Sequence, residues 1–195
     1  PKILANLELN LKKPIFPSLN SCWHYDEKVA QHYLLKSINA PCVPSWVFYN
    51  YDEANKFIEN AEFPLVFKLS VGAGSANVIK IDNKEDARII VERMFKKGIF
   101  PYTVNEFNEK GRIKDRIKEG FDYIKNGNYP NPPWYYMIQK DYVYFQKFLP
   151  NNKFDIRLVV IGDRCFAFIR YNRENDFRAS GSGKRDYSLK NIPME

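Results

Sequence analysis

Residues 64–81 read PLVFKLSVGAGSANVIKI, in which two apolar runs flank a short glycine-rich loop. The pattern predicts a strand at 65–69, a loop at 70–76 and a strand at 77–81. Lys68 alternates with three apolar residues of the first strand, so its side chain is expected on the opposite face of the sheet. Two interpretations fit this stretch: a lysine and a glycine flap that hold a phosphate, or an exposed lysine beside an ordinary glycine turn.

The glycines of this loop follow neither of the two common phosphate-binding patterns. No Gly-Lys-Ser or Gly-Lys-Thr sequence follows them, as a Walker P-loop requires. Asn77 occupies the place of the third glycine of a dinucleotide-binding loop. Gly72 and Gly74 still allow the backbone to approach a ligand closely, with N–H groups that can point at anionic oxygens. A phosphate flap of another kind therefore stays open.

The composition suits a globular protein with an anionic partner. Hydrophobic residues make up 45% of the 195 residues, and 30 Lys and Arg outnumber 23 Asp and Glu, for a net charge of +7. Such a charge favours binding of nucleotides, phosphorylated metabolites, nucleic acid or a membrane surface, although a solvated basic surface would also explain it. Three cysteines without a CxxC pair indicate a reducing compartment, and two histidines supply a zinc site or a histidine-based triad poorly. No apolar run has the length of a membrane span, so we expect a cytoplasmic protein without a membrane partner.

Apolar periodicity divides the rest of the chain into helices and strands. Residues 1–22 are expected to be irregular, and Asp26 is expected to cap the first long helix. A charged stretch at about 100–140 reads as a peripheral insertion. Helices are expected at 25–38, 51–63, 83–97 and 114–127, and further strands at 46–49 and 141–149.

The stretch FDIRLVVIGDRCFAFIRY (154–171) predicts a β-hairpin with a two-residue Gly-Asp turn. This turn sets Asp155 opposite Arg170 and places both on one face with Arg157. The arginines could bind phosphate or carboxylate, and the aspartate could accept hydrogen bonds from a ribose. The alternative is a cross-strand salt bridge between Asp155 and Arg170, worth about 0.2–1 kcal/mol.

The polar stretch DFRASGSGK (176–184) repeats this combination of an arginine with small residues. Arg178 precedes a run of alanine, serine and glycine that permits close approach of a ligand. A flexible basic surface loop is the alternative interpretation.

Taken in order, these stretches resemble the ATP-grasp superfamily, most closely its ribosomal-protein glutamate ligase-like branch of carboxylate–amine ligases. The likeness covers about residues 24–99 and 141–186. It implies an α+β fold in which two α+β subdomains with mainly antiparallel sheets clamp ATP. The chain would then consist of an N-terminal linker with helices at 1–62, a glycine-flap subdomain at 63–148 that contains the insertion, and the start of a second subdomain at 149–195, whose C-terminal part is missing.

The resemblance also implies site residues. Lys68 would bind the phosphates of ATP under the flap, the hinge at 146–149 would hold adenine largely through its backbone, and Asp155 would meet the ribose. The implied nucleotide-binding residues are Lys28, Lys68, Gly72, Gly74, Ser75, Ala76, Gln146, Lys147, Phe148, Leu149 and Asp155. The implied catalytic residues are Arg157, Arg170 and Arg178, which would hold phosphates or an acyl phosphate. Three positions depart from the family pattern: Glu27 separates Asp26 from Lys28, Lys147 replaces a glutamate, and Ser180 replaces an asparagine.

The implied reaction activates a carboxylate as an acyl phosphate with ATP, after which an amine or a thiol attacks it. Such chemistry needs charge neutralisation and positioning more than a covalent nucleophile. No Glu-x-Asn-like motif follows Ser188, so the ligands of Mg²⁺ are expected outside this chain and none within it. Because the chain also starts without Met, we expect a fragment of a longer protein that is inactive by itself.

Two other functions compete with this one. The first is an ATP-grasp domain that binds nucleotide without turnover. The second is a basic nucleic-acid-binding module, whose affinity would fall steeply with salt. It is disfavoured because basic residues are spread through the chain and the insertion also carries many acids. Its candidate residues are Lys114, Arg116, Lys118, Tyr135 and Tyr136.

Overall fold

In the computed structural model, the stretch 64–81 folds as the expected antiparallel pair, β2 (Leu65–Lys68) and β3 (Val78–Ile81). The structure describes residues 2–72, 74–75, 77–101 and 137–192. Ala76, the helix expected at 114–127 and all five candidate nucleic-acid-binding residues lie outside this description. The chain divides into two compact units, Pro1–Phe148 and Leu149–Glu195, and each is considered by itself.

A four-stranded antiparallel sheet with the order β1-β4-β2-β3 organises the first unit. Its outer strand β1 (Ser45–Phe48) pairs with β4 (Val143–Lys147), which is inserted between β1 and β2 although it comes last in the chain. Gln146 of β4 therefore stands opposite Ser45 on one side and Val66 on the other. Segments about a hundred residues apart in sequence thus become neighbours.

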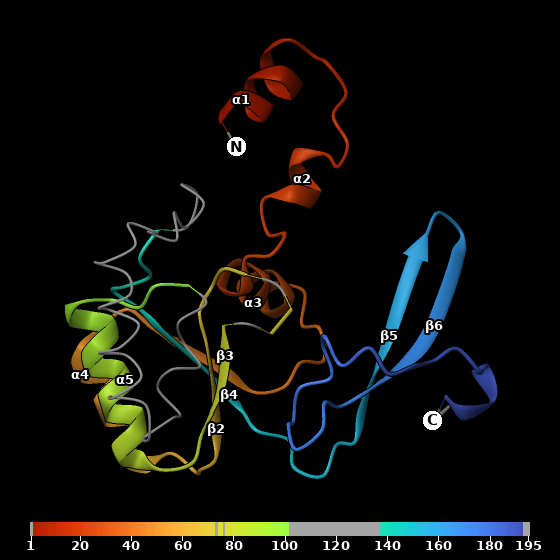
Figure 1. Cartoon of the computed structure of the whole chain (residues 1–195). Helices are drawn as coiled ribbons and strands as arrows, with labels where there is room; N and C mark the ends of the chain where they lie inside the picture. The colour runs from red at the N-terminus through yellow and green to blue at the C-terminus, as the bar shows by residue number, and fades with distance from the viewer. Residues whose placement is uncertain (1, 73, 76, 102–136, 193–195) are drawn as a thin grey trace, which may run out of the picture. The chain divides into compact units, whose positions relative to one another are not determined.

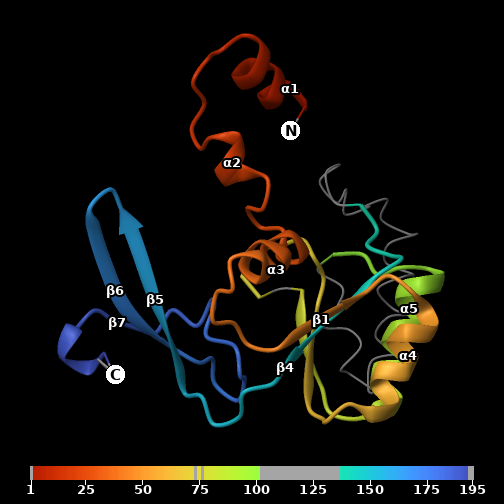
Figure 2. The ribbon, with the colours of Figure 1, turned by 180° about the vertical axis from the view of Figure 1, so that it is seen from behind.

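Two helices cover one face of this sheet (Figures 1 and 2). They are α4 (Tyr51–Asn60) and α5 (Lys84–Lys96), and each begins at an asparagine whose side chain accepts backbone N–H groups of the first turn. Their apolar faces bury residues such as Ile58 and Met94 against Phe67 and Phe145 of the sheet. Because side chains alternate along a strand, Lys68, Tyr144 and Gln146 emerge on the other face.

The helix α3 (Lys28–Ser37) lies beside this other face, as the contact between His32 and Tyr144 shows. Its expected cap is corrected. Asp26 has a left-handed backbone (φ 53°), and Glu27 is the capping residue, with its side chain accepting the N–H of Ala30. The extended backbone of Glu27 also bridges to Val71, so the start of α3 is set by a tertiary contact as well as by local preference.

The N-terminal stretch is more regular than expected. Instead of an irregular chain before residue 22, the structure has three short helical segments: α1 (Lys2–Ala5), the π-helical turn η1 (Asn6–Asn10) and α2 (Leu19–Cys22). Pro14 and Pro17 lie between η1 and α2, so the prolines separate the segments instead of abolishing them.

The second unit is a three-stranded antiparallel sheet with the order β5-β6-β7. Its strands are β5 (Phe154–Ile161), β6 (Arg164–Tyr171) and the short β7 (Arg185–Asp186), followed by the helical turn η3 (Leu189–Asn191). The predicted hairpin register is confirmed, from Ile161 opposite Arg164 to Asp155 opposite Arg170. The α+β class with antiparallel sheets is therefore also confirmed. Within the described ranges, no helix has the length and apolar character needed to cross a bilayer.

Candidate functional site

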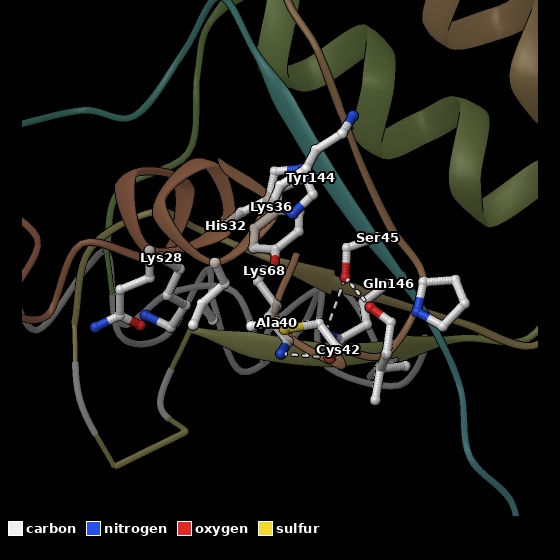
Figure 3. A pocket seen from close by; sticks show the side chains of 13 residues that line it. Lys28, His32, Lys36, Ala40, Cys42, Ser45, Lys68, Tyr144 and Gln146 are labelled. Carbon is white, nitrogen blue, oxygen red and sulfur yellow. Dashed lines mark hydrogen bonds between the residues drawn. The ribbon is translucent and has the colours of Figure 1, made fainter. Parts of the chain in front are cut away.

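A cleft of about 400 Å³ opens in the first unit, on the face of the sheet that α4 and α5 leave uncovered (Figure 3). One wall is α3, the second is the segment 40–45 that leads into β1, and the floor comes from β2 and β4. Lys68, expected to bind phosphates, and Lys28, expected near the nucleotide, line this same cleft. They come from positions 40 residues apart and are brought together by the packing of α3 on the sheet.

Lys68 lies at the floor of the cleft, where β2 ends. Its ammonium donates a hydrogen bond to Oε1 of Gln146 at 2.6 Å and stands 5.9 Å from the centre of the Tyr144 ring. Burial, together with the positive charge of Lys28, lowers the pKa of Lys68 to about 8. The fold therefore makes the charged form of Lys68 less stable than it would be in water. A bound anion would offset this penalty.

Lys28 ties the start of α3 to the root of the glycine loop. Its ammonium donates to the carbonyl oxygens of Val71 at 3.2 Å and Gly72 at 2.5 Å. Burial lowers the pKa of Lys28, and the nearby Asp26 and Glu27 oppose this shift in part. The backbone N–H of Lys28 donates to the carbonyl of Ser70 at 2.7 Å, so the helix and the loop share a common anchor.

The glycine loop adopts the backbone that its glycines permit. Gly72 (φ 96°), Gly74 (φ 67°) and Ser75 (φ 59°) all have positive φ, a region that residues other than glycine seldom occupy. A Cβ atom at Gly74 would meet nothing within 4 Å, so this glycine serves backbone conformation and not close packing. The root of the loop is fixed by Asn77, a buried residue whose side chain donates to the carbonyl of Val71 at 2.8 Å.

The charge of the cleft is one-sided. Its described lining contains Lys28, His32, Lys36 and Lys68, and no carboxylate is among those residues. Burial and the charge of Lys36 lower the pKa of His32, so this ring adds a donor more than a charge at neutral pH. A cavity whose described lining holds several cations and no carboxylate is suited to a polyanion.

The four hinge residues lie at and after the end of β4. Gln146 reaches the cleft, whereas the side chain of Lys147 is exposed and its backbone N–H donates to the carbonyl of Pro44 at 2.8 Å. The ring of Phe148 lies 5.4 Å from the ammonium of Lys80. Leu149 is exposed and begins the second unit.

The remaining predicted site residues belong to the second unit. Arg170 and Asp155 form a two-pronged ion pair, with nitrogen–oxygen distances of 2.8 and 2.6 Å, and this bond raises the pKa of Arg170. This is the cross-strand salt bridge that the sequence offered as an alternative to ligand binding. Nε and Nη2 of Arg178 both donate to Oδ2 of Asp176, at 2.8 and 2.6 Å. Arg157 has an exposed side chain on β5.

Sequence reasoning identified Lys28 on α3 but missed other residues of the cleft, among them His32, Lys36, Ser45 and Tyr144. On α3, Lys28, His32 and Lys36 recur at intervals of four and therefore share one face, a signal that helical periodicity could have revealed. Ser45 and Tyr144 had no such signal, because only the strand order brings them together. Burial raises the pKa of Tyr144.

Magnesium, which the family resemblance implies, does not match the donors present. Among the residues that the structure describes, no group of three or more His, Cys, Asp or Glu side chains is placed to hold a metal ion. Asp26 and Glu27, the two acidic residues that immediately precede α3, are not part of the cleft lining.

No family model matches the sequence, and no curated protein matches it. Solved structures with a similar arrangement include a D-alanine–D-alanine ligase from Helicobacter pylori, at 14% identity and a TM-score of 0.43, with 88% of this chain and 42% of that one covered. A D-alanyl-alanine synthetase A from Vibrio cholerae O1 biovar eltor is similar at 9% identity and a TM-score of 0.41, with 76% and 34% covered. The chain thus spans well under half the length of these enzymes.

Proposed function

We propose that the cleft binds the phosphates of ATP and that the chain is the nucleotide-binding part of an ATP-grasp ligase. The longer protein would activate a carboxylate as an acyl phosphate for attack by an amine or a thiol. The observation that carries this proposal is the convergence of two desolvated lysines, Lys28 and Lys68, on a cleft beside the glycine loop whose described lining has no carboxylate. Phosphate oxygens are the ligands that such a site would stabilise most.

The role assigned to each residue follows from its place in the cleft. Lys68 would contact the phosphates from the floor of the sheet, and the loop that contains Gly72 and Gly74 would offer backbone N–H groups from the side. Gln146 and the backbone of the following residues would border the base. The assignment to the ATP-grasp ligases, and to their glutamate ligase-like branch, is proposed from the sequence motifs at 64–81, 154–171 and 176–184.

The binding step is tested by calorimetry with ATP, ADP, tripolyphosphate and adenosine on the 195-residue chain. Lys68→Met should weaken ATP and tripolyphosphate binding at least about tenfold, because charge-assisted hydrogen bonds contribute about 1.5–3 kcal/mol. Lys96→Met is the matched control: it removes the same charge from α5, which lies against the other sheet face and where Lys96 bonds Glu92. It should leave the affinity unchanged.

Unchanged ATP affinity in Lys68→Met would overturn the assignment of the phosphate site. Binding of adenosine as tight as that of ATP would overturn it as well, because the cleft would then recognise the nucleoside alone. If the chain instead prefers single-stranded DNA or RNA, with an affinity that falls steeply with salt, the nucleic-acid interpretation replaces it.

The ligase step is tested in the full-length protein. Incubation with ATP, a set of carboxylates and hydroxylamine traps any acyl phosphate as a hydroxamate, with release of ADP. Hydroxamate that depends on one carboxylate would support the ligase and identify its substrate. ATP binding with neither ADP nor hydroxamate for any carboxylate would favour a nucleotide-binding domain without turnover.

A further inference from the structure

Three polar side chains on three neighbouring strands form a chain of hydrogen bonds at the floor of the cleft (Figure 3). Lys68 of β2 donates to Oε1 of Gln146 at 2.6 Å, and Nε2 of Gln146 donates to Oγ of Ser45 at 2.9 Å. The hydroxyl of Ser45 in turn donates to the carbonyl of Val43 at 2.8 Å. These hydrogen bonds run from Val43, in the wall of the cleft, to the ammonium of Lys68 at its floor.

The direction of each bond follows from the donors available. A serine hydroxyl has one hydrogen, and that of Ser45 points to the carbonyl of Val43, so its oxygen is free to accept from the amide of Gln146. This orients the NH₂ group of Gln146 toward β1. The carbonyl oxygen of the same amide then has to face β2, where it meets Lys68.

Sheet register holds these residues together. Ser45 and Gln146 are directly opposed on β1 and β4, and Gln146 is opposed by Val66 on β2. Lys68 lies two residues beyond Val66, on the same face, and is thus a diagonal neighbour within reach of a long side chain. The arrangement is part of the sheet and not of a loose loop.

We propose that Ser45 is a positioning residue of the phosphate site: it orients the Gln146 amide, whose carbonyl oxygen fixes the Lys68 ammonium in the cleft without neutralising its charge. This inference rests on the proposed function, because it assigns the oriented cation to a phosphate ligand. A carboxylate in place of the amide would hold Lys68 equally well. It would, however, neutralise the positive charge that an incoming anion needs.

The other titratable groups that face Lys68 are consistent with this role. From α3 they are Lys28, His32 and Lys36, from the segment 40–45 Cys42, and from β4 Tyr144. No carboxylate is among these described residues, and the ammonium is held by the neutral amide of Gln146 beside the Tyr144 ring.

The test compares Ser45→Ala with Ser45→Thr, which keeps the hydroxyl and suits a strand. Two measurements are made: the affinity for tripolyphosphate and ATP, and the NMR titration of the Lys68 side chain without ligand. In Ser45→Ala the amide loses its acceptor and is free to rotate. We expect the affinity to fall about three- to tenfold, as for the loss of one hydrogen bond, and Lys68 to titrate at lower pH than in the parent. Ser45→Thr should restore both values.

An independent variant, Gln146→Glu, keeps the shape and changes the charge. It should raise the pH at which Lys68 titrates and yet weaken tripolyphosphate binding, because the new carboxylate competes with the ligand. A merely structural role of the residue would not move these two measurements in opposite directions. If Ser45→Ala does not fold, Gln146→Glu tests the proposal in its place. An affinity of Gln146→Glu for tripolyphosphate that equals or exceeds that of the parent would then overturn the proposal.

The failure modes are distinct. A parent chain that binds neither ATP nor tripolyphosphate overturns the proposed function, and with it the assignment of a phosphate site. A parent that binds normally, with a Ser45→Ala variant of unchanged affinity and unchanged Lys68 titration, overturns only the role of Ser45. Loss of binding that Ser45→Thr does not restore also overturns it.

Discussion

At the scale of single residues, Lys68 has the most distinctive chemistry in the described chain. Strand alternation already predicted that its side chain would leave the apolar face of β2. Its environment was not predictable, because its partner Gln146 is 78 residues away and its neighbouring cation Lys28 lies on a separate helix. The lowered pKa is a product of tertiary packing, which no local pattern contains.

This pKa predicts how ATP affinity depends on pH. Bound phosphate favours the ammonium form, so binding raises the pKa of Lys68 above its free value of about 8. Above pH 8 the free chain must take up a proton to bind, and the affinity should fall as pH rises, by at most about tenfold per unit for this lysine. Calorimetry between pH 7.5 and 9.5 measures the decline.

The control for this prediction is Lys68→Arg, because a guanidinium stays charged throughout this range. Its affinity should decline less between pH 7.5 and 9.5, with a remaining slope from Lys28, whose pKa is also lowered. An ATP affinity of the parent that does not change with pH would contradict the role of Lys68. So would a Lys68→Arg variant with the full slope of the parent.

At the scale of elements, sequence patterns were most successful where contacts are local. The β2–β3 pair, the helices α4 and α5 and the register of the β5–β6 hairpin all follow from periodicity and turn residues in continuous stretches. The sequence patterns failed at the cap of α3, where Glu27 and not Asp26 is the capping residue, because the backbone there also bridges to Val71. The basic face of α3 was readable from its spacing but was interpreted only at Lys28.

The backbone conformation of the glycine loop predicts how a substitution of Gly74 changes the affinity for ATP. Because a Cβ at Gly74 meets no neighbour, Gly74→Val should act only through the positive φ, which costs a branched residue about 1–2 kcal/mol. We expect an ATP affinity about five- to thirtyfold lower, as the loop leaves this conformation.

Gly74→Asn provides the matched comparison, since asparagine tolerates a left-handed backbone. It should retain an affinity close to that of the parent in the same calorimetric assay. Equal affinities for the valine and asparagine variants would show that the observed loop backbone is not the one that binds the nucleotide.

At the scale of the whole molecule, a buried tyrosine joins parts of the chain that are distant in sequence. Tyr142 accepts the backbone N–H of Ser70 at 2.7 Å and donates to Oε1 of Gln139 at 2.9 Å. Gln139 bridges to Ile99 through two backbone hydrogen bonds. One hydroxyl thus connects the root of the glycine loop to the paired backbones of Ile99 and Gln139. Burial raises the pKa of Tyr142 to about 12, so it stays a donor at physiological pH.

Tyr142→Phe should therefore destabilise the first unit. It leaves the N–H of Ser70, a residue only 4% exposed, without its acceptor, and the penalty for such a buried group is about 1–3 kcal/mol. Urea unfolding measures the change, and hydrogen exchange at Ser70 should accelerate. Tyr51→Phe, at an exposed site on α4, is the control and should change the free energy of unfolding by less than about 0.5 kcal/mol. Equal stability of the two variants would contradict this role.

The position of β4 in the sheet has a consequence for biosynthesis. In the described sheet, β1 pairs only with β4, and the cleft needs side chains from α3, β1, β2 and β4 together. A ribosome makes the first three well before the fourth, so the cleft cannot assemble until residue 147 has been translated and released from the tunnel. Until then β1 has no partner, and the exposed apolar strands of the nascent chain are the segments most in need of chaperones. Ligand binding can begin only after most of this chain has been synthesised.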